Sequence, residues 1–542
     1  MSNRRSFWGW GTEVSGPTEE QSVAIAKTIA QRFGVDDLEL RPPPRITDVE
    51  LRAARLTPPD SLAARCASDP LERAGHTYGK SYRDVVRGAR GEFENPPDVV
   101  AFPESEDEVA ALLDWAGDAG AAAIPYGGGS SVVGGVEADV GDTYTGAICI
   151  DLSRLDAVLE IDRASRAARI QAGIFGPALE TALRPLGLTL RHFPQSFEFS
   201  TLGGWIATRS GGHYATLHTH IDDFVESMRV VTPTGVVESR RLPGSGAGPS
   251  PDRLFLGSEG ILGIITEAWM RLQDRPTFRA SASVRFAAAS GSDDDAFARG
   301  ARAVRVLAQS GLFPANCRLL DPLEAATSGA GNGDDAVLVL GFESADHPLD
   351  TKMARALELC RDAGGIAPDG TVATRTDTAP ARDEAARAWR NAFLRAPYAR
   401  DVLARAAVIS ETFESAVTWD RFESFHADVM QATRDAVKRI CGAGSVTCRF
   451  THVYPDGAAP YFTVLAPSRH GSELSQWAEI KSAASEVLLA HGGTITHHHA
   501  VGRDHRPWYD RQRPDVFARA LGAAKAELDP RWVMNPGVLI PN

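Results

Sequence analysis

The sequence has few cysteines, and their spacing offers no obvious pairs. Six cysteines are scattered over 542 residues, and none belongs to a CxxC motif. Isolated cysteines of this kind are typical of reduced thiols and argue against a disulfide framework or a zinc site. We therefore expect neither disulfides nor a bound metal.

Two other features are absent: a long uncharged apolar run and an excess of positive charge. No run of 18 apolar residues is present, so no spanning helix is expected, and the start MSNRRSFWGWG lacks the apolar core of a secretory signal. The formal net charge of −13 argues against nucleic-acid binding driven by bulk charge. These absences favour a soluble cytoplasmic enzyme.

The composition itself is that of a large globular protein. Hydrophobic residues make up 43% and charged residues 23% of the chain, enough for a sizeable core and at least two domains. Nearly all basic residues are arginine, and alanine and glycine are abundant, which is typical of a bacterium with a GC-rich genome.

A β-α-β unit is predicted ahead of a glycine-rich segment. Residues 99–103 form a strand, Ser105 caps a helix in a capping box with Glu108, Gly120 ends the helix, and 121–125 form a second strand. Apolar residues at helical spacing mark the buried face of this helix: Val109, Leu112, Leu113 and Ala116.

Two more segments have clear helical patterns. Residues 18–30 have helical spacing and stop at Gly34, within a polar N-terminal part. A strand near 168–172 and a helix over 177–183, closed by Gly187, predict a second β-α-β unit.

The segment ProTyrGlyGlyGlySerSerValValGlyGly (125–135) is the first motif that indicates chemistry. Consecutive glycines allow backbone N–H groups to converge on a phosphate, although a flexible turn is the alternative. The glycine spacing fits neither a Walker loop nor a Rossmann fingerprint. Further small-residue loops occur at 194–208, 221–235 and 256–267, and together these loops suit a long, phosphate-bearing cofactor.

In this order the loops resemble the FAD-binding domain of the vanillyl-alcohol oxidase/PCMH flavoprotein superfamily, and LeuAspPro…AsnProGly (528–537) fits as well. The resemblance implies an α+β fold: a PCMH-type FAD-binding domain of two subdomains and an α+β cap with an antiparallel sheet, after a helical N-terminal segment. The glycine loop lacks the histidine that tethers FAD in some members, so non-covalent FAD is expected. The residues expected to line FAD are Pro125, Gly127, Gly128, Gly129, Ser130, Ser131, Ser196, Thr201, Gly203, Gly204, Ser258, Glu259 and Ile265.

The most unusual local feature is a histidine triplet, His497, His498 and His499. The preceding residues 490–496 predict a turn and a strand, which would place His497 and His499 on one face and His498 on the other. Near a flavin, a histidine is suited to proton transfer. A metal site and ordinary structural histidines are the alternatives, and the metal reading lacks cysteine or carboxylate ligands at typical spacing.

The triplet resembles the hallmark of the alkylglycerone-phosphate synthases (alkyl-dihydroxyacetonephosphate synthases), and segments 6–11, 412–421 and 448–462 resemble that family too. The resemblance implies that His498 is the acid/base, with His497 and His499 beside it. It also makes Tyr461 an active-site tyrosine. Residues expected to be needed for activity or substrate binding are Arg400, Arg318 and His192.

The implied reaction exchanges the acyl group of acyl-dihydroxyacetone phosphate for a fatty alcohol through a flavin N5 adduct, without net redox change. A dehydrogenase or oxidase of a 2-hydroxy acid or alcohol on the same fold is the main alternative, and a non-catalytic flavin-binding scaffold is a third. Gln195 stands where the eukaryotic family pattern has aspartate, and no peroxisomal signal is evident. The resemblance also implies a homodimer with peripheral contact to the inner membrane surface.

Four segments are expected along the chain. Residues 1–92 form the helical N-terminal segment, 93–275 the FAD-binding domain and 276–510 the cap or substrate domain. Residues 511–542 return to the FAD-binding domain.

Overall fold

The computed structural model describes residues 4–288, 295–367, 373–376 and 384–541. Its first sheet, of four strands, contains the predicted β-α-β unit. The strand order is β1-β2-β4-β3, in which β2, β4 and β3 are parallel and β1 is antiparallel. These strands are Cys66–Ala67, Val99–Ala101, Ala147–Asp151 and Ala122–Tyr126. Helix α5 (Glu106–Ala119) joins β2 to β3 and buries the predicted face.

Both ends of α5 follow from the sequence. The Ser105 hydroxyl accepts from the Glu108 N–H, and Gly120 closes the helix with a φ of 62°. The carboxylate of Glu108 accepts from the Glu104 N–H at 2.7 Å, so the predicted cap is present without its reciprocal half. Helix α1 (Glu19–Phe33) likewise ends at Gly34, as predicted.

The second sheet has five antiparallel strands in the order β5-β6-β10-β8-β9. They are Val158–Asp162, Ala167–Gln171, Ile264–Arg271, Val225–Thr232 and Gly235–Glu238. The prediction of a second β-α-β unit is wrong, although its strand and its helix α6 (Gly176–Leu183) exist. After α6 the chain enters β7 (Leu188–Thr189), which pairs only with β11 (Gln273–Asp274) among the described strands, and β6 pairs antiparallel with its neighbours.

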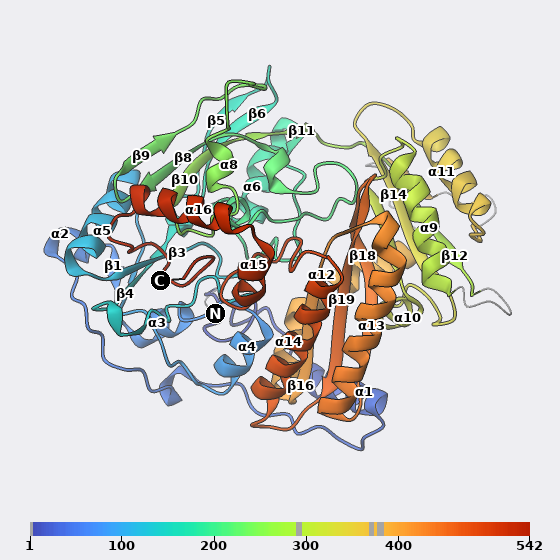
Figure 1. Cartoon of the computed structure of the whole chain (residues 1–542), viewed down its shortest axis with the longest axis horizontal. Helices are drawn as coiled ribbons and strands as arrows, with labels where there is room; N and C mark the ends of the chain where they lie inside the picture. The colour runs from blue at the N-terminus through green and yellow to red at the C-terminus, as the bar shows by residue number, and fades with distance from the viewer. Residues whose placement is uncertain (1–3, 289–294, 368–372, 377–383, 542) are drawn as a thin grey trace.

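The third sheet has eight strands along the path β15-β12-β14-β13-β18-β19-β16, with β17 paired to β19, and all its pairs are antiparallel. In chain order, the strands β12 to β19 are Phe278–Phe286, Asn316–Leu320, Ala336–Ser344, Ala373–Thr376, Val408–Glu414, Val417–Thr418, Ser445–Val453 and Gly457–Pro467. Figure 1 shows α13 (Trp419–Cys441) and α14 (Glu473–Ala490) side by side; α13 packs on β18 and β19, and α14 packs on β16.

The remaining helices connect these layers (Figure 1). They are α2 (Asp60–Ala63), α3 (Pro70–Gly75), α4 (Tyr82–Ala89), α7 (Leu202–Thr208), α8 (Asp252–Phe255), α9 (Ala296–Gln309), α10 (Pro322–Ser328), α11 (Asp350–Asp362), α12 (Glu384–Arg405), α15 (Arg506–Gln512) and α16 (Asp515–Leu528). Helix α12 packs on α1, α4 and β16, so the N-terminal segment lies against the third sheet.

Both ends of the described chain reach the first sheet. Ala123 of β3 accepts from the Asn535 N–H at 2.9 Å and donates to the Val533 carbonyl at 2.7 Å. From the other end, the Arg5 guanidinium donates to the Gly127 carbonyl at 3.1 Å and pairs with the buried Asp151. The strand that leads into the glycine loop is therefore held from both sides.

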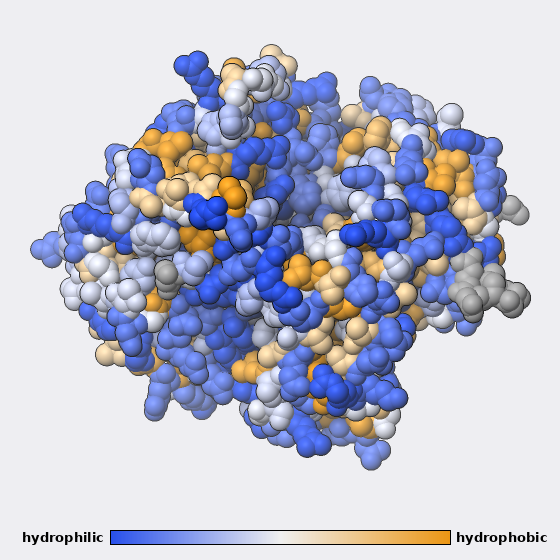
Figure 2. Space-filling model, in the orientation of Figure 1, coloured by the Kyte–Doolittle hydropathy of each residue, from blue (hydrophilic) through white to orange (hydrophobic). Residues whose placement is uncertain are grey.

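The surface is mixed in polarity. Figure 2 shows a largely hydrophilic face with scattered hydrophobic groups and a hollow between the two lobes of the molecule. Among the described residues, none of the helices combines the length and apolarity needed to cross a membrane.

Candidate active site

The glycine loop follows β3 and packs directly on the chain at 199–201. A Cβ on Gly128 would lie 1.7 Å from the Phe199 carbonyl oxygen, and one on Gly127 would lie 2.3 Å from Thr201 Oγ1. Gly129 has a φ of 68°, which favours glycine. Within the described chain, the backbone N–H groups of residues 128–131 donate to no protein acceptor. This close-packed loop with free donors forms a cradle for an anion.

Two adjoining cavities meet at this loop, and the residues that line both are Gly127, Ser131, Val136, Thr201, Gly204 and Thr208. All residues predicted to contact the cofactor line one or both of them. Those in the first cavity are Gly127, Gly128, Gly129, Ser130, Ser131, Ser196, Thr201 and Gly204. Those in the second are Pro125, Gly127, Ser131, Thr201, Gly203, Gly204, Ser258, Glu259 and Ile265.

This pair of cavities fits FAD. Two adjoining cavities with free backbone N–H groups on the loop that lines both suit a dinucleotide, because the diphosphate needs fixed donors between two flat ring systems. The glycines are required by packing, since side chains at 127 and 128 would collide with 199–201. The residues that would hold FAD are thus the glycine loop, the 196–204 segment and the 258–265 segment.

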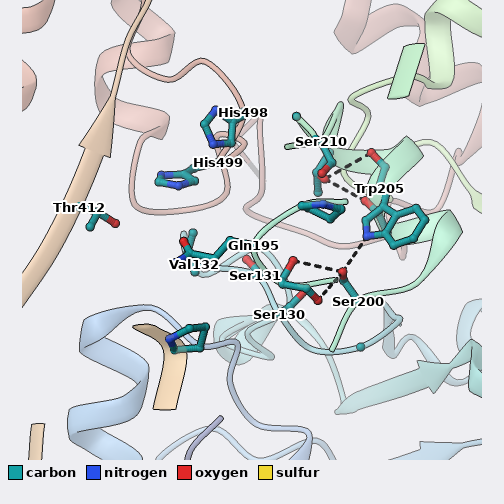
Figure 3. Close-up of a pocket in the computed structure, with 18 of the residues that line it drawn as sticks. Ser130, Ser131, Val132, Gln195, Ser200, Trp205, Ser210, Thr412, His498 and His499 are labelled. Carbon is teal, nitrogen blue, oxygen red and sulfur yellow. Dashed lines mark hydrogen bonds between the residues drawn. The ribbon is translucent and has the colours of Figure 1, made fainter. Parts of the chain in front are cut away.

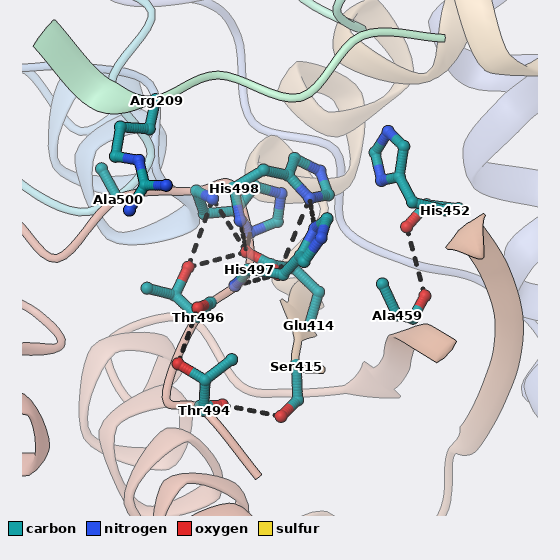
Figure 4. A network of polar contacts seen from close by, with 12 residues as sticks. Arg209, Glu414, Ser415, His452, Ala459, Thr494, Thr496, His497, His498 and Ala500 are labelled. Carbon is teal, nitrogen blue, oxygen red and sulfur yellow. Dashed lines mark hydrogen bonds and ion pairs between the residues drawn. The ribbon is translucent and has the colours of Figure 1, made fainter. Parts of the chain in front are cut away.

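The histidine triplet lies at the other side of the first cavity and is organised by Glu414, the last residue of β16. The Glu414 carboxylate accepts from three consecutive backbone N–H groups: from His497, from His498 at 3.0 Å and from His499 at 2.8 Å (Figure 4). It also accepts from the Thr496 hydroxyl at 2.7 Å. Burial alone would raise the pKa of Glu414, but the backbone N–H donors and the Thr496 hydroxyl stabilise the carboxylate and hold its pKa below the ordinary value.

Of the turn and strand predicted for residues 490–496, the turn is present at 491–492 but the strand is wrong. The backbone bends at residue 495 and at 497–499, because an anion that collects successive N–H groups curls the backbone around itself. The predicted faces are wrong as well. His498 and His499 line the cavity, whereas His497 does not. Figure 3 shows the His498 and His499 rings side by side, with Gln195 and Ser131 also at the pocket.

His498 has the properties of a proton acceptor. Its Nδ1 lies 3.0 Å from Nδ1 of His497, and 15% of its side chain is exposed. Burial, followed by the neighbouring rings of His499 and His497, lowers the pKa of His498 well below its ordinary value of 6.5. The imidazole is therefore neutral at physiological pH and has a lone pair available.

Tyr461 and Arg449 form a second wall of the cavity. Tyr461, on β19, pairs in register with Glu414 of β16 and with Arg449 of β18. The guanidinium carbon of Arg449 lies 4.0 Å from the centre of the Tyr461 ring, and its Nη1 donates to Glu324 at 2.6 Å. Arg449 is thus neutralised by a carboxylate and serves to hold Tyr461 in place.

The predicted arginines both line the cavity but differ in their contacts. Arg318 donates to the His213 carbonyl at 2.9 Å and lies over the Trp389 ring at 4.4 Å. Burial, together with Arg449, lowers the pKa of Arg318 to about 9. Arg400 contacts the Thr412 hydroxyl at 3.5 Å and has no carboxylate partner within the described chain.

His192 does not line either cavity. It is buried between Trp205 and Phe224, with ring-centre distances of 5.1 and 5.8 Å, and its Nε2 lies 3.3 Å from the Ser210 hydroxyl. Burial lowers the pKa of His192 to about 3. Its expected role in direct substrate binding has no support here, because Ser210, and not His192, lines the cavity.

Glu259 has a structural contact in addition to its place in the second cavity. Its carboxylate accepts from the N–H groups of Val501 and Gly502 at 2.8 and 2.7 Å. Burial raises the pKa of Glu259 to about 7. The FAD-lining segment is therefore joined to the chain that follows the triplet.

Sequence reasoning missed several residues around the triplet: Glu414, His452, Arg449, His220 and Tyr454. Glu414, Arg449, His452 and Tyr454 lie in the two segments that carried the resemblance, 412–421 and 448–462, but nothing in their local pattern distinguished them. One nitrogen each from His452, His497 and His498 lies within 4.8 Å of the others, close enough for a metal ion. The 3.0 Å separation of the His497 and His498 nitrogens is also that of a hydrogen bond.

Comparison with known proteins supports the interpretation of these cavities as an FAD site. Residues 97–239 match the family "FAD binding domain", and residues 283–539 match "FAD linked oxidases, C-terminal domain". The fold and the site thus define an FAD-dependent enzyme of the PCMH type, and FAD is its cofactor.

Relatives that match nearly the whole chain define the family more narrowly. The chain is 30% identical to the alkyldihydroxyacetonephosphate synthase of Dictyostelium discoideum, over 98% of this chain and 86% of the relative. It is 28% identical to that of Trypanosoma brucei brucei, over 93% and 85%. A solved alkyldihydroxyacetonephosphate synthase structure matches with a TM-score of 0.77 at 26% identity, covering 98% of this chain and 97% of that one. The chain belongs to the alkyldihydroxyacetonephosphate synthase family.

The cradle can be tested with Gly128→Ala. The added methyl would overlap the Phe199 carbonyl, so the loop must move and its N–H groups would no longer point toward one anion. We expect the purified variant to retain less than about a tenth of the wild-type FAD, measured from the ratio of flavin to protein absorbance. Gly246→Ala, where a Cβ meets nothing within 4 Å, is the control. Wild-type FAD content in Gly128→Ala would contradict this assignment.

The Glu414 anchor can be tested with Glu414→Gln. A neutral amide loses the charge-assisted bonds and turns an N–H₂ group toward backbone donors, so we expect about 3 kcal/mol or more of destabilisation. The measurement is the free energy of unfolding of the FAD-loaded protein in denaturant. Glu423→Gln, at an exposed residue of α13, should change it by less than about 0.5 kcal/mol. Equal values for the two variants would refute the anchoring role.

Proposed function

We propose that this protein exchanges the acyl group of an acyl-dihydroxyacetone phosphate for a fatty alcohol, which forms an ether bond. The observation that carries the proposal is the shared cavity. A neutral imidazole, a phenol and a guanidinium that pairs with no carboxylate among the described residues line the same space as the FAD cradle. These groups are His498, Tyr461 and Arg400.

His498 is the proposed base. A neutral imidazole with a free nitrogen can take the proton from C1 of the substrate, next to the ketone, and can return it after the exchange. His499 lies beside it, and its Nδ1 is 3.6 Å from Glu414. His497 lies behind it and contacts it at 3.0 Å. Of the triplet, His498 and His499 are therefore placed to face substrate, and His497 contacts His498 on the side away from the cavity.

Arg400 is the proposed phosphate anchor. Arginine binds phosphate oxygens through paired N–H donors, and a guanidinium already paired with a carboxylate would be unavailable. Arg449 is paired with Glu324, and Arg318 donates to a backbone carbonyl, so Arg400 is the best candidate of the three. Arg318 contributes positive charge and shapes the wall.

When bound, FAD supplies an electron-accepting ring system that can share the electrons left at C1. The protein's part is to place C1 near His498, to fix the phosphate at Arg400 and to donate a hydrogen bond from the Tyr461 hydroxyl. The exchange is balanced. The bond between C1 and the acyl oxygen breaks, and the bond between C1 and the alcohol oxygen forms. The alcohol loses its hydroxyl proton, and the fatty acid leaves as the acid or its anion. No external oxidant is consumed.

An FAD-linked dehydrogenase or oxidase of a 2-hydroxy acid or alcohol is the second candidate. The match of residues 283–539 to the C-terminal domain of FAD-linked oxidases favours it. There, the same His498 would take the hydroxyl proton of a substrate that is oxidised. The two reactions differ in their net redox change. The oxidation transfers two electrons from the substrate to the flavin, whereas the exchange leaves the oxidation state of the substrate unchanged.

The lipid nature of the proposed substrates also supports peripheral contact with a membrane surface, and we propose a homodimer as the working assembly. Both proposals follow from the family resemblance. They are separate from the chemistry proposed for the cavity.

The synthase proposal is tested by anaerobic incubation with palmitoyl-dihydroxyacetone phosphate and labelled hexadecanol. We expect labelled alkyl-dihydroxyacetone phosphate to form while the flavin is not bleached to its reduced form. His498→Gln should lower the rate by roughly 10²–10⁴-fold. His491→Gln, at an exposed histidine, should leave it unchanged. No alkyl product from folded, FAD-loaded protein, or full bleaching by a 2-hydroxy acid, would overturn the proposal.

Arg400→Met tests the phosphate anchor. Loss of one charge-assisted contact is worth about 1.5–3 kcal/mol, so KM for the phosphate substrate should rise by roughly 10–100-fold. Inhibition by inorganic phosphate should weaken in parallel, since both anions use the same cation. Arg395→Met, at an exposed position on the same helix, is the matched control. An unchanged KM in Arg400→Met would place the phosphate elsewhere.

A further inference from the structure

A chain of hydrogen bonds runs from His498 to a backbone carbonyl outside the cavity. His498 Nδ1 lies 3.0 Å from His497 Nδ1, and His497 Nε2 lies 2.7 Å from the Tyr454 hydroxyl. His220 Nε2 lies 3.0 Å from that hydroxyl and 3.2 Å from His497 Nε2. At the far end, His220 Nδ1 lies 3.1 Å from the carbonyl oxygen of Arg209. Figure 4 shows the His497, His498 and Arg209 part of this region.

The end of the chain fixes its direction. A carbonyl oxygen only accepts, so His220 Nδ1 carries a hydrogen, and in the neutral ring His220 Nε2 is a bare lone pair. This lone pair faces both the Tyr454 hydroxyl and His497 Nε2.

Two assignments are then possible for His497. If its Nε2 were also bare, two lone pairs would face each other at 3.2 Å, which is repulsive, and the single Tyr454 hydrogen could serve only one of them. If His497 Nε2 carries the hydrogen, it donates to Tyr454, and Tyr454 donates to His220. Every donor in the chain then has an acceptor, which favours the second assignment.

The consequence reaches the cavity. With its hydrogen on Nε2, neutral His497 has a bare Nδ1, which accepts from Nδ1–H of His498. His498 Nε2, on the opposite edge of the ring, is then the bare nitrogen, and no described protein group bonds to it. We propose that His220, directly and through Tyr454, is a positioning residue that holds His498 in the tautomer able to accept a proton at Nε2.

This inference rests on the proposed function only for the role of His498 as base. The tautomer itself can be measured without any assay. It also separates a hydrogen-bonded pair from a metal ion held between the two Nδ1 atoms, because such an ion needs the lone pairs of both.

The first test is a ¹⁵N NMR measurement of histidine tautomers in the FAD-loaded wild-type protein above neutral pH, with His498→Gln used to assign the signals of His498. We expect His498 to carry hydrogen on Nδ1 and His497 on Nε2. Hydrogen on His498 Nε2 would overturn the proposal. A metal found by elemental analysis, with neither Nδ1 protonated, would overturn it in favour of a metal site.

The second test uses variants of the chain. In His220→Phe the Tyr454 hydroxyl is free to donate to His497 Nε2, which reverses the chain and puts the hydrogen on His498 Nε2. We expect kcat to fall by at least about 10-fold with KM and FAD content unchanged. His220→Gln, whose amide oxygen can accept at the same place, should restore most of kcat. Tyr454→Phe should keep the wild-type tautomer, since His497 can donate directly to His220.

His218→Phe removes another imidazole from the same loop and is the control, because His218 contacts Phe224 and lies outside the chain. A drop in kcat that His220→Gln does not relieve, or that occurs with the wild-type tautomer intact, would show that His220 acts only through folding. Absence of any synthase activity in the wild type, with the expected tautomers present, would refute the proposed reaction and leave the assignment standing.

Discussion

The active site depends on one buried anion, the carboxylate of Glu414. It takes hydrogen bonds from three successive peptide groups and one hydroxyl, and so supplies the acceptors that a strand would otherwise provide to residues 496–499. Because the partners are backbone groups, the curl of the chain does not depend on the imidazoles themselves. The histidines are therefore free to differ in role: two face the cavity, and one faces the protein behind it.

A second carboxylate performs a similar task for the cofactor side. Glu259 takes the N–H groups of Val501 and Gly502, two residues beyond the triplet, while Asn535 donates to the Glu259 carbonyl at 2.7 Å. The segment that carries the histidines is thus held at one end by the third sheet and at the other by the FAD-binding part. The relative position of base and cofactor is set by these two anchors.

Much of the cofactor site could be predicted from sequence, because its signals are local. Glycine loops, the cap at Ser105 and the stop at Gly120 depend on residues a few positions apart, and all the predicted FAD-lining residues line the two cavities. The shape of the triplet could not be predicted, since it is set by Glu414, 83 positions before His497. His192, which the family resemblance suggested as a substrate contact, lies between two aromatic rings, a tertiary environment that local sequence patterns do not reveal. The segment boundaries stay a prediction.

The pairing of residues 533–535 with β3 has a consequence for how the enzyme is made. The strand that feeds the glycine loop is synthesised early, but its neighbour at Val533 and Asn535 emerges from the ribosome hundreds of residues later. Between those moments the cradle has an open edge and lacks the Asn535 contact to Glu259. We therefore expect stable FAD binding only after this segment has been translated. A nascent chain stalled before it would remain colourless.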